Sequence, residues 1–220
     1  LDSSVISYSI EYYSTLPTFE EQVITTSATA SLFEIQSVTV QADARNIAGY
    51  FRLEFNGQTT DNIKWNANAE GANSVAQALA RLSTMGPVSV TRQLSRIVVS
   101  GLVVSASASD VALTVVSGSI GSLSLGSIIW VANRQFYVGA NPSVLNGIPL
   151  VDSTLTNPVA FGMTLQSVNV FVWSYGYTWI INFNNQIGDL PTLIATSSDN
   201  WAGTNVELIV TTIRQGVAPL

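Results

Sequence analysis

Cysteine and histidine are both absent from the 220 residues of this chain. Histidine is the usual general acid or base near neutral pH, and both residues are common ligands of zinc, copper and iron–sulfur centres. Their absence removes most familiar catalytic and metal-binding constellations, and a chain without cysteine forms no disulfide. The composition therefore favours a structural protein over an enzyme.

Charged residues are also scarce, at 10% of the chain, against about 25% in typical globular domains. Hydrophobic residues make up 47%, which excludes disorder driven by polarity. A surface with so few charges must be dominated by Ser, Thr, Asn and Gln. Two interpretations stay open: a partner covers much of this surface, or the chain is a β-rich secreted domain with hydroxylated faces.

Positive charges are few and scattered, with eight Lys and Arg residues and a net charge of −6. The sequence has no basic patch, so nucleic acid is not an expected partner. No apolar run reaches the roughly 18 residues that a membrane-spanning helix needs, so membrane insertion is not expected either. The sequence starts at Leu1 without a basic segment followed by an apolar one, and we expect a processed product or a piece of a longer polypeptide.

Alternation of apolar and polar residues with period two predicts a mainly β fold. The apolar side chains of residues 51–55 share one face, and Asn56-Gly57 tolerates the positive φ angles of a type I′ turn, which predicts a hairpin with residues 58–65. Residues 177–183 form another alternating strand. Residues 206–213 carry β-branched side chains on both faces, which is typical of a central strand or of a strand covered on two sides.

Residues 69–85 are the one segment with helical spacing of apolar residues. Asn68 can cap the start of this helix, and Gly86-Pro87 ends it. We expect the only sizeable helix here, lying close against a sheet because its apolar stripe consists mostly of small residues. The apolar positions that carry the spacing are Ala72, Val75, Ala76, Leu79 and Leu82.

Turn residues divide the chain into an expected arm and two β units. Residues 1–32 are expected to be an N-terminal arm or linker, with a strand at 5–13 that Pro17 and Glu20-Glu21 interrupt. Residues 33–95 and 173–220 are expected to form a split, sandwich-like module with the helix. Residues 96–172 are expected to be an inserted small β unit like a barrel. Its predicted strands are 97–104, 111–116, 128–132, 135–139 and 168–173.

Five blocks of the sequence are similar, in the same order, to a β module of large secreted proteins. They are residues 49–60 (Gly-Tyr-Phe-Arg-Leu-Glu-Phe-Asn-Gly-Gln-Thr-Thr), 74–79, 85–92, 176–183 and 188–193. This module is repeated many times in secreted proteins of stramenopiles and other protists that often carry immunoglobulin-like IPT/TIG domains, and phage tail proteins contain similar modules. The resemblance covers about half of the chain and implies an extracellular architectural or adhesive role. It supplies no catalytic residues, and the block 96–172 departs from the simplest versions of the module.

Carboxylates are the only remaining side chains that suit acid–base catalysis. A glycosidase needs two of them about 5 to 10 Å apart, and no local pattern singles out a pair. We therefore expect no hydrolase or redox activity and no catalytic residue. The carboxylates considered are Glu54, Asp61, Glu70, Asp189, Asp199 and Glu207.

Calcium could use Asp61-Asn62 or Asp199-Asn200, because it prefers oxygen ligands. Neither pair has the spacing of a calcium-binding loop. Asp and Asn in turns more often bond to their own backbone, and this interpretation is favoured for both pairs. We expect neither a metal site nor a cofactor.

The tryptophans could form a platform that stacks on sugars, although such residues more often anchor a core or an interface. Trp179 alternates with Tyr177 and Ile181, which favours a core position. Residues 173–177 are expected to be a turn-like run whose aromatic side chains meet a neighbour. Trp201 lies in an expected loop and is the best candidate for a surface contact.

These features predict a structural subunit or repeat module of an extracellular filament, hair or surface coat. The expected partners are copies of the chain itself or neighbouring modules of the same polypeptide, joined by β-strand and aromatic contacts. We expect the strand at 5–13 to add to a sheet of a neighbouring copy. The alternatives are an adhesive module that binds carbohydrate, with glycans as partners, and a phage or virus tail component.

Overall fold

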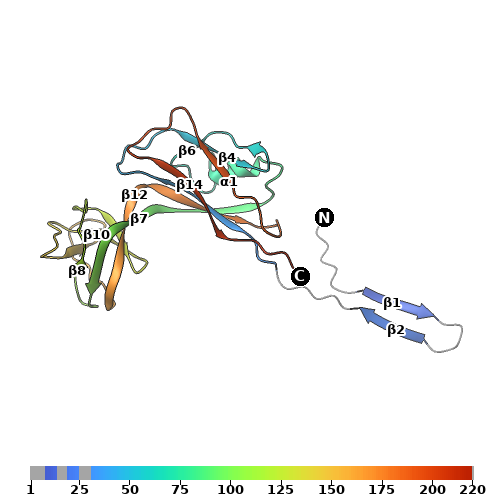
Figure 1. Cartoon of the computed structure of the whole chain (residues 1–220), viewed down its shortest axis with the longest axis horizontal. Helices are drawn as coiled ribbons and strands as arrows, with labels where there is room; N and C mark the ends of the chain where they lie inside the picture. Colours follow the sequence, from blue (N-terminus) through green and yellow to red (C-terminus); the bar gives the residue numbers. More distant parts are fainter. Residues whose placement is uncertain (1–7, 14–18, 25–30, 220) are drawn as a thin grey trace.

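The computed structural model describes residues 8–13, 19–24 and 31–219, and it shows a mainly β protein (Figure 1). One short helix lies within these residues, and the strands pair antiparallel. The predicted mainly β fold with one helix is therefore confirmed.

The first two strands form a hairpin, and the later strands belong to two larger sheets. The hairpin strands are β1 (Tyr8–Tyr13) and β2 (Phe19–Ile24). The later elements, in chain order, are β3 (Ile35–Gln41), β4 (Tyr50–Phe55), β5 (Gln58–Thr59), β6 (Ile63–Lys64), α1 (Val75–Ala80), β7 (Val88–Ala106), β8 (Ala112–Ser117), β9 (Ile128–Val131), β10 (Arg134–Val138), β11 (Ile148–Val151), β12 (Leu165–Phe183), β13 (Ile194–Ser197) and β14 (Glu207–Arg214).

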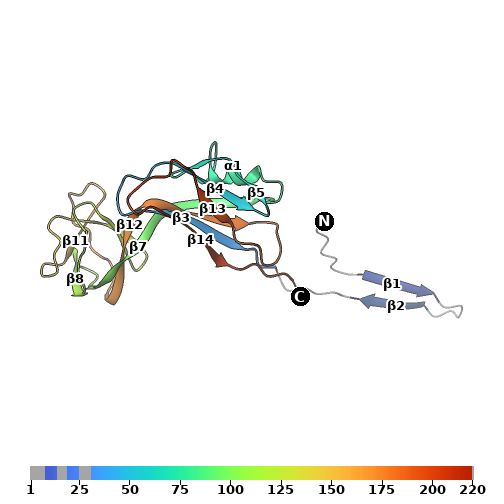
Figure 2. The same cartoon turned by 45° about the horizontal axis from the view of Figure 1, so that its top comes forward.

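The larger sheet has eight strands in the order β14-β3-β12-β7-β8-β11-β10-β9. Its last strand, β9, also pairs with β12, with Trp130 opposite Phe171. Six strands therefore close into a ring, while β3 and β14 extend the sheet beyond it. Figures 1 and 2 show β7 and β12 side by side, running from the open part of the sheet into the closed part.

The smaller sheet, in which β4 pairs with β13, β5 and β6, packs against the open part of the larger one. The ring of Phe51 lies 5.5 Å from that of Trp179, and the ring of Phe55 lies 5.5 Å from that of Phe183. All four side chains are buried. Two sheets thus face each other across one apolar core, which we call the sandwich core.

The hairpin predicted from Asn56-Gly57 is confirmed. Asn56 has φ 47° and Gly57 has φ 77°, which are the positive angles that a type I′ turn requires. The turn joins β4 to β5, and Glu54 pairs with Thr59 across it. The apolar residues of β4 point into the core in strict alternation, as the sequence predicts.

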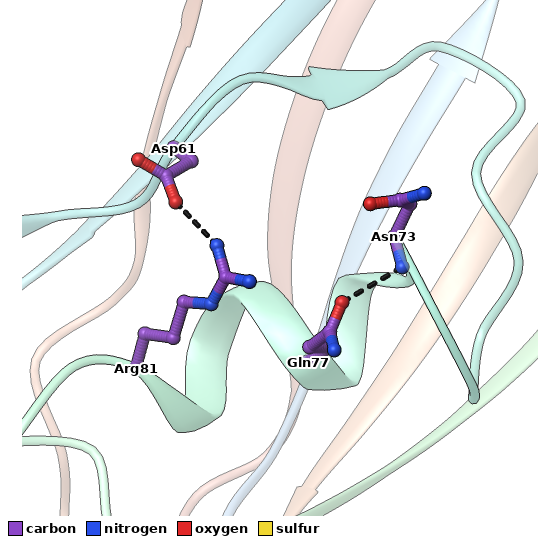
Figure 3. Close-up of polar contacts among 4 residues, drawn as sticks. All are labelled: Asp61, Asn73, Gln77 and Arg81. Carbon is purple, nitrogen blue, oxygen red and sulfur yellow. Dashed lines mark hydrogen bonds and ion pairs between the residues drawn. The ribbon is translucent and has the colours of Figure 1, made fainter.

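The helix α1 is much shorter than predicted. Gly71 has φ 92° and Asn73 has φ 54°, so the chain before Ser74 is in the left-handed region and is not helical. Ser74, and not Asn68, is the N-cap: its Oγ accepts a hydrogen bond from the backbone N of Gln77 at 3.0 Å. Figure 3 shows the side chain of Gln77 accepting in turn from the backbone N of Asn73 at 2.7 Å.

The closed part of the large sheet has its own apolar core, which we call the barrel core. Side chains that point inward fill it, and Phe136 stacks on Phe161 with ring centroids 5.2 Å apart. The predicted neighbouring strands around Trp130 and Phe136 are confirmed, since β9 and β10 pair. The sequence analysis missed β11 because Pro149 lies inside it; Pro149 has no N–H to donate, but its carbonyl accepts from the N of Gly139 at 2.8 Å.

The limits predicted for the inserted unit fall inside continuous strands. Arg96 of β7 pairs with Trp173 of β12, and Ile97 pairs with Val172. The two ends of the block 96–172 are therefore neighbours in one ladder, and β7 and β12 each contribute to both cores. The division into units at these limits stays a prediction.

The arm strand expected at 5–13 has a partner in its own chain. β1 pairs with β2 over Tyr8–Tyr13, while residues 5–7 and Pro17 lie outside the described residues. Glu20 and Glu21 do not interrupt the arm but lie in β2. The expectation of a single unpaired strand is therefore corrected to a two-stranded hairpin, and neither strand joins another sheet in the described chain.

Within residues 8–13, 19–24 and 31–219, no helix has the length and apolar character needed to span a bilayer.

Candidate functional site

Three of the carboxylates considered as catalytic candidates, Asp61, Glu70 and Glu207, bond to groups of the protein itself. Asp61 pairs with Arg81 at 2.6 Å on the surface near α1 (Figure 3). Glu70 Oε1 accepts from the backbone N of Val90 at 3.2 Å. Among the residues that the structure describes, no group of three or more acidic side chains is placed to hold a metal ion.

The two Asp-Asn pairs considered for calcium are engaged in other contacts. Asn62 Oδ1 accepts from Arg52 Nε at 2.8 Å, beside the ion pair of Asp61 with Arg81. Asn200 Oδ1 accepts from the hydroxyl of Ser198. The oxygens of Asp61 and Asn62 thus bind arginine side chains. The Oδ1 of Asn200 binds the hydroxyl of a nearby serine.

Asp152 organises an exposed turn through hydrogen bonds to its carboxylate. Hydrogen bonds from the side chains of Thr154, at 2.6 Å, and Asn157, at 2.7 Å, hold the pKa of Asp152 well below its usual range. Backbone N–H groups of Thr156 and Asn157 add to this effect. The shift comes from local turn bonds, so it marks a structural role.

Trp201 does not present its ring as a free surface contact. It lies in a loop, as predicted, but it is half-buried and packs against the sandwich core. Its ring meets that of Phe51 edge-on at 6.4 Å. Its expected role as the best surface-contact candidate is therefore wrong, because β4 lies directly beneath the loop.

Residues 173–177 form a β-bulge inside β12 and not a turn. The register with β7 shifts between Trp173 and Tyr177. Ser95 Oγ holds the bulge by accepting from the hydroxyl of Ser174 at 2.7 Å and from the N of Gly176 at 3.1 Å. Gly176 is required here, because a Cβ at this position would overlap the carbonyl oxygen of Val40.

The edge strand β14 is the main interaction surface that the fold leaves open. It pairs with β3 alone, in regular register from Glu207 to Thr212. Leu208 and Val210 pack on the sandwich core, whereas Ile209 is 39% exposed on the opposite face. The predicted central position or cover on two sides is therefore wrong within the described chain.

The features that usually protect a sheet edge are confined to the ends of β14. Natural edge strands carry charges, proline or bulges that prevent pairing with another chain. In β14 the charges are Glu207 and Arg214, and the register irregularity falls between Thr212 and Arg214. The segment between these ends has no charged residue and no proline.

Apolar side chains continue beside this edge. Ile213 is 53% exposed, and Leu32 and Val217, which form a backbone bridge with each other, are each 48% exposed. Single exposed apolar residues are ordinary, but a row along an unpaired edge is typical of an interaction site. We call β14 with Leu32 and Val217 the β14 edge.

Sequence reasoning missed this edge because the apolar pattern of β14 is the same on both faces. Leu208 and Val210 alternate with Ile209 and Ile213, so periodicity gives no preference for one buried face. β14 is an edge because β3 is its one partner strand in the described chain, and strand pairing is not encoded in the local pattern. The charges of Glu207 and Arg214 at the two ends of the strand are the one local feature that indicates an edge position.

Comparisons with known proteins give no relative: no protein-family model matches the chain, and no curated protein matches it. The resemblance of the five sequence blocks to the secreted β module therefore stays a prediction.

Proposed function

We propose that this protein is a structural subunit or repeat module of an extracellular filament, hair or surface coat, and that it assembles through the β14 edge. The observation that carries the proposal is an uncharged strand segment with one unpaired side and exposed Ile209 and Ile213. Such an edge is a template for another strand. A second copy could also cover the exposed face of β14 that carries Ile209 and Ile213.

The proposed occupant of this edge is the β1–β2 hairpin of a neighbouring copy. A two-stranded hairpin alone is at best marginally stable in water, so it gains most from a third strand. Its strands have six residues each, and the regular part of β14, Glu207–Thr212, has the same length. Addition would extend the eight-stranded sheet with strands from the next copy.

Such a contact joins two different surfaces and therefore propagates. Each copy has one hairpin and one β14 edge, so assembly is head-to-tail, and head-to-tail contacts give open filaments when the rotation does not close a ring.

The β14 edge is tested with Ile209→Lys in the full chain. A lysine on an edge strand opposes pairing with another chain, and because the side chain is exposed, the fold should tolerate it. We expect filaments seen by negative-stain electron microscopy to disappear and sedimentation velocity to show monomers. The matched control is Val116→Lys, which changes an exposed valine on β8, a strand with a partner on each side.

Removing the hairpin tests the other half of the contact. Deleting residues 1–30 should give a folded monomer, because β1 and β2 form a sheet of their own and pair with no other strand of the described chain. Circular dichroism checks the fold, and sedimentation checks the assembly. Filaments of unchanged repeat from the deletion variant, or from Ile209→Lys, contradict the proposed contact.

A further inference from the structure

A cleft with two arginines lies where β7 and β12 pass from the sandwich core to the barrel core. Its volume is ≈ 350 Å³, and its lining comes from β7, β9, β10 and β12. It is separate from the β14 edge, since β3 and β12 lie between β14 and β7 in the sheet. The lining residues that matter below are Arg92, Arg96, Trp130, Gln135 and Tyr177.

Both arginines lack an acidic partner. The one ion pair in the described chain joins Arg81 to Asp61, and no carboxylate lines the cleft. Arg92 Nη1 donates to the carbonyl oxygens of Asn66 and Ala67 at 2.8 and 2.9 Å, which fixes its position without neutralising it. The guanidinium of Arg96 makes no hydrogen bond with the described residues. A chain of net charge −6 thus has a locally positive cleft.

Aromatic rings hold each guanidinium in place. Arg92 Cζ lies 4.4 Å from the ring centroid of Tyr177. Arg96 Cζ lies 6.0 Å from that of Trp130 and 5.6 Å from that of Phe171. Stacking on a ring leaves the N–H edge of a guanidinium free, and that planar fork matches a carboxylate with two parallel hydrogen bonds.

The other groups of the cleft suit a sugar. Ring faces such as that of Trp130 stack on apolar C–H surfaces, and the exposed side-chain amide of Gln135 can donate to and accept from hydroxyl groups. The volume is at the lower end for small-ligand sites, so it holds a short segment. Scattered positive charge elsewhere gives no track for a nucleic-acid backbone.

We propose that this cleft binds a uronic-acid unit of an acidic polysaccharide, with Arg96 on its carboxylate, Trp130 and Gln135 on its ring, and Arg92 on oxygens of the adjoining unit. This binding does not depend on filament assembly. It would attach an assembled coat to a matrix of anionic polysaccharide. Recognition by two arginines makes the affinity dependent on ionic strength, because screening weakens exposed charge pairs.

The test measures binding of an oligogalacturonate to the full chain by titration calorimetry. The controls are a neutral galactose oligomer of the same length and dextran sulfate. We expect the uronate alone to bind measurably, with affinity that falls as salt rises. Arg96→Gln should weaken binding at least about tenfold, as expected for a charge-assisted hydrogen bond, while Arg81→Gln, which removes the same charge elsewhere, should leave it unchanged.

A second readout separates the cleft from non-specific attraction. Binding should change the tryptophan fluorescence of the full chain, and this change should be lost in Trp130→Phe. No uronate binding, equal binding of the neutral oligomer, or equal loss in Arg96→Gln and Arg81→Gln overturns the proposal. Binding of dextran sulfate as tight as that of the uronate overturns the assignment to a carboxylate.

Discussion

The sandwich core and the barrel core solve the same problem, burying one face of a sheet, in different ways. The sandwich core is covered by a second layer: the small sheet and α1 contribute Phe51, Leu53 and Leu79. The barrel core is covered by the same sheet turning back on itself, with β9 paired to β12. Burial of the sandwich core depends on contacts between two layers. Burial of the barrel core depends on the closure of six strands into a ring.

This difference determines where each region is vulnerable. In the sandwich region, buried polar side chains attach loops to the sheet: Gln36 accepts from the N of Leu193 and donates to the carbonyl of Pro191. In the barrel region, glycines let neighbouring strands and loops approach closely, and a Cβ at Gly118 or Gly147 would overlap a carbonyl oxygen. Close approach at a glycine also occurs in the sandwich region, where Gly176 meets Val40, so the buried polar attachments of the loops are what distinguish the sandwich region.

The largest effect is expected from Trp179→Ala in the sandwich core. Trp179 is fully buried, contacts Phe51, and donates Nε1–H to the carbonyl of Ala67 at 3.0 Å. Its truncation should lower the free energy of unfolding by about 3–5 kcal/mol. Hydrogen exchange should show amides of β3 and β4 losing more protection than those of β8 and β10, since the barrel core contains no sandwich residue. Equal losses in both regions would show that the cores unfold as one.

A slightly smaller effect is expected from Glu34→Ala. Glu34 is fully buried; its Oε1 accepts from Gln36 Nε2 at 2.5 Å, and its Oε2 accepts from the N of Leu190 at 2.6 Å. Removing it leaves buried donors unpaired, which should lower the free energy of unfolding by about 3 kcal/mol in urea titrations. Glu207→Ala, at an exposed site, should change it by less than about 0.5 kcal/mol. Comparable losses in the two variants would mean that Glu34 does not attach the loop.

The closure of the barrel is tested with Gly147→Ala. Gly147 has φ 80°, and an added Cβ would overlap the carbonyl oxygen of Leu113. Gly71→Ala is the matched control, because Gly71 has φ 92° with no atom within 4 Å of the added Cβ. Thermal and urea unfolding should show a loss of about 2 kcal/mol for the first and about 1 kcal/mol for the second. If the two losses are the same, close approach of the backbone contributes nothing beyond the φ angle.

The smallest expected effect is a pH-dependent change in the free energy of unfolding caused by Asp152→Asn. The pKa of Asp152 is lowered in the folded state by Thr154 and Asn157, so the carboxylate contributes stability above its unfolded pKa and loses it as the pH falls through the folded pKa. Wild type should therefore be slightly more stable than Asp152→Asn at neutral pH, with a difference that shrinks only in strong acid. Unfolding curves at several pH values measure this, and a difference that is constant with pH contradicts it.

The parts of the fold that the sequence predicts well are local. The alternation of residues 51–55 and the positive φ preference of Asn56-Gly57 lie within one short segment, so no distant residue is needed to infer the hairpin. The helix was only partly predicted, because helical spacing extends over Gly71 and Asn73 although both adopt left-handed angles. Periodicity reports which side chains are apolar, and it does not report backbone angles.

The parts that were missed depend on distant partners. The 19-residue strand β7 was divided around Arg96 in the sequence interpretation, yet pairing with β12 carries it through this position. Trp201 was assigned to a loop, but its burial depends on Phe51. The arginine cleft follows from sheet closure, since the pairing of β9 with β12 brings Trp130 beside Arg96.

The shared strands β7 and β12 have a consequence for synthesis on the ribosome. Domains are made from the N-terminus onward, and the sandwich core starts first, with Val38, but is incomplete until Leu193 has emerged. The barrel core starts later, at Leu102, and has all its buried residues once Val170 has emerged. The unit that begins second can thus finish first. The nascent chain then holds β3 without a partner strand until the second half of β12 arrives on a barrel that is already closed.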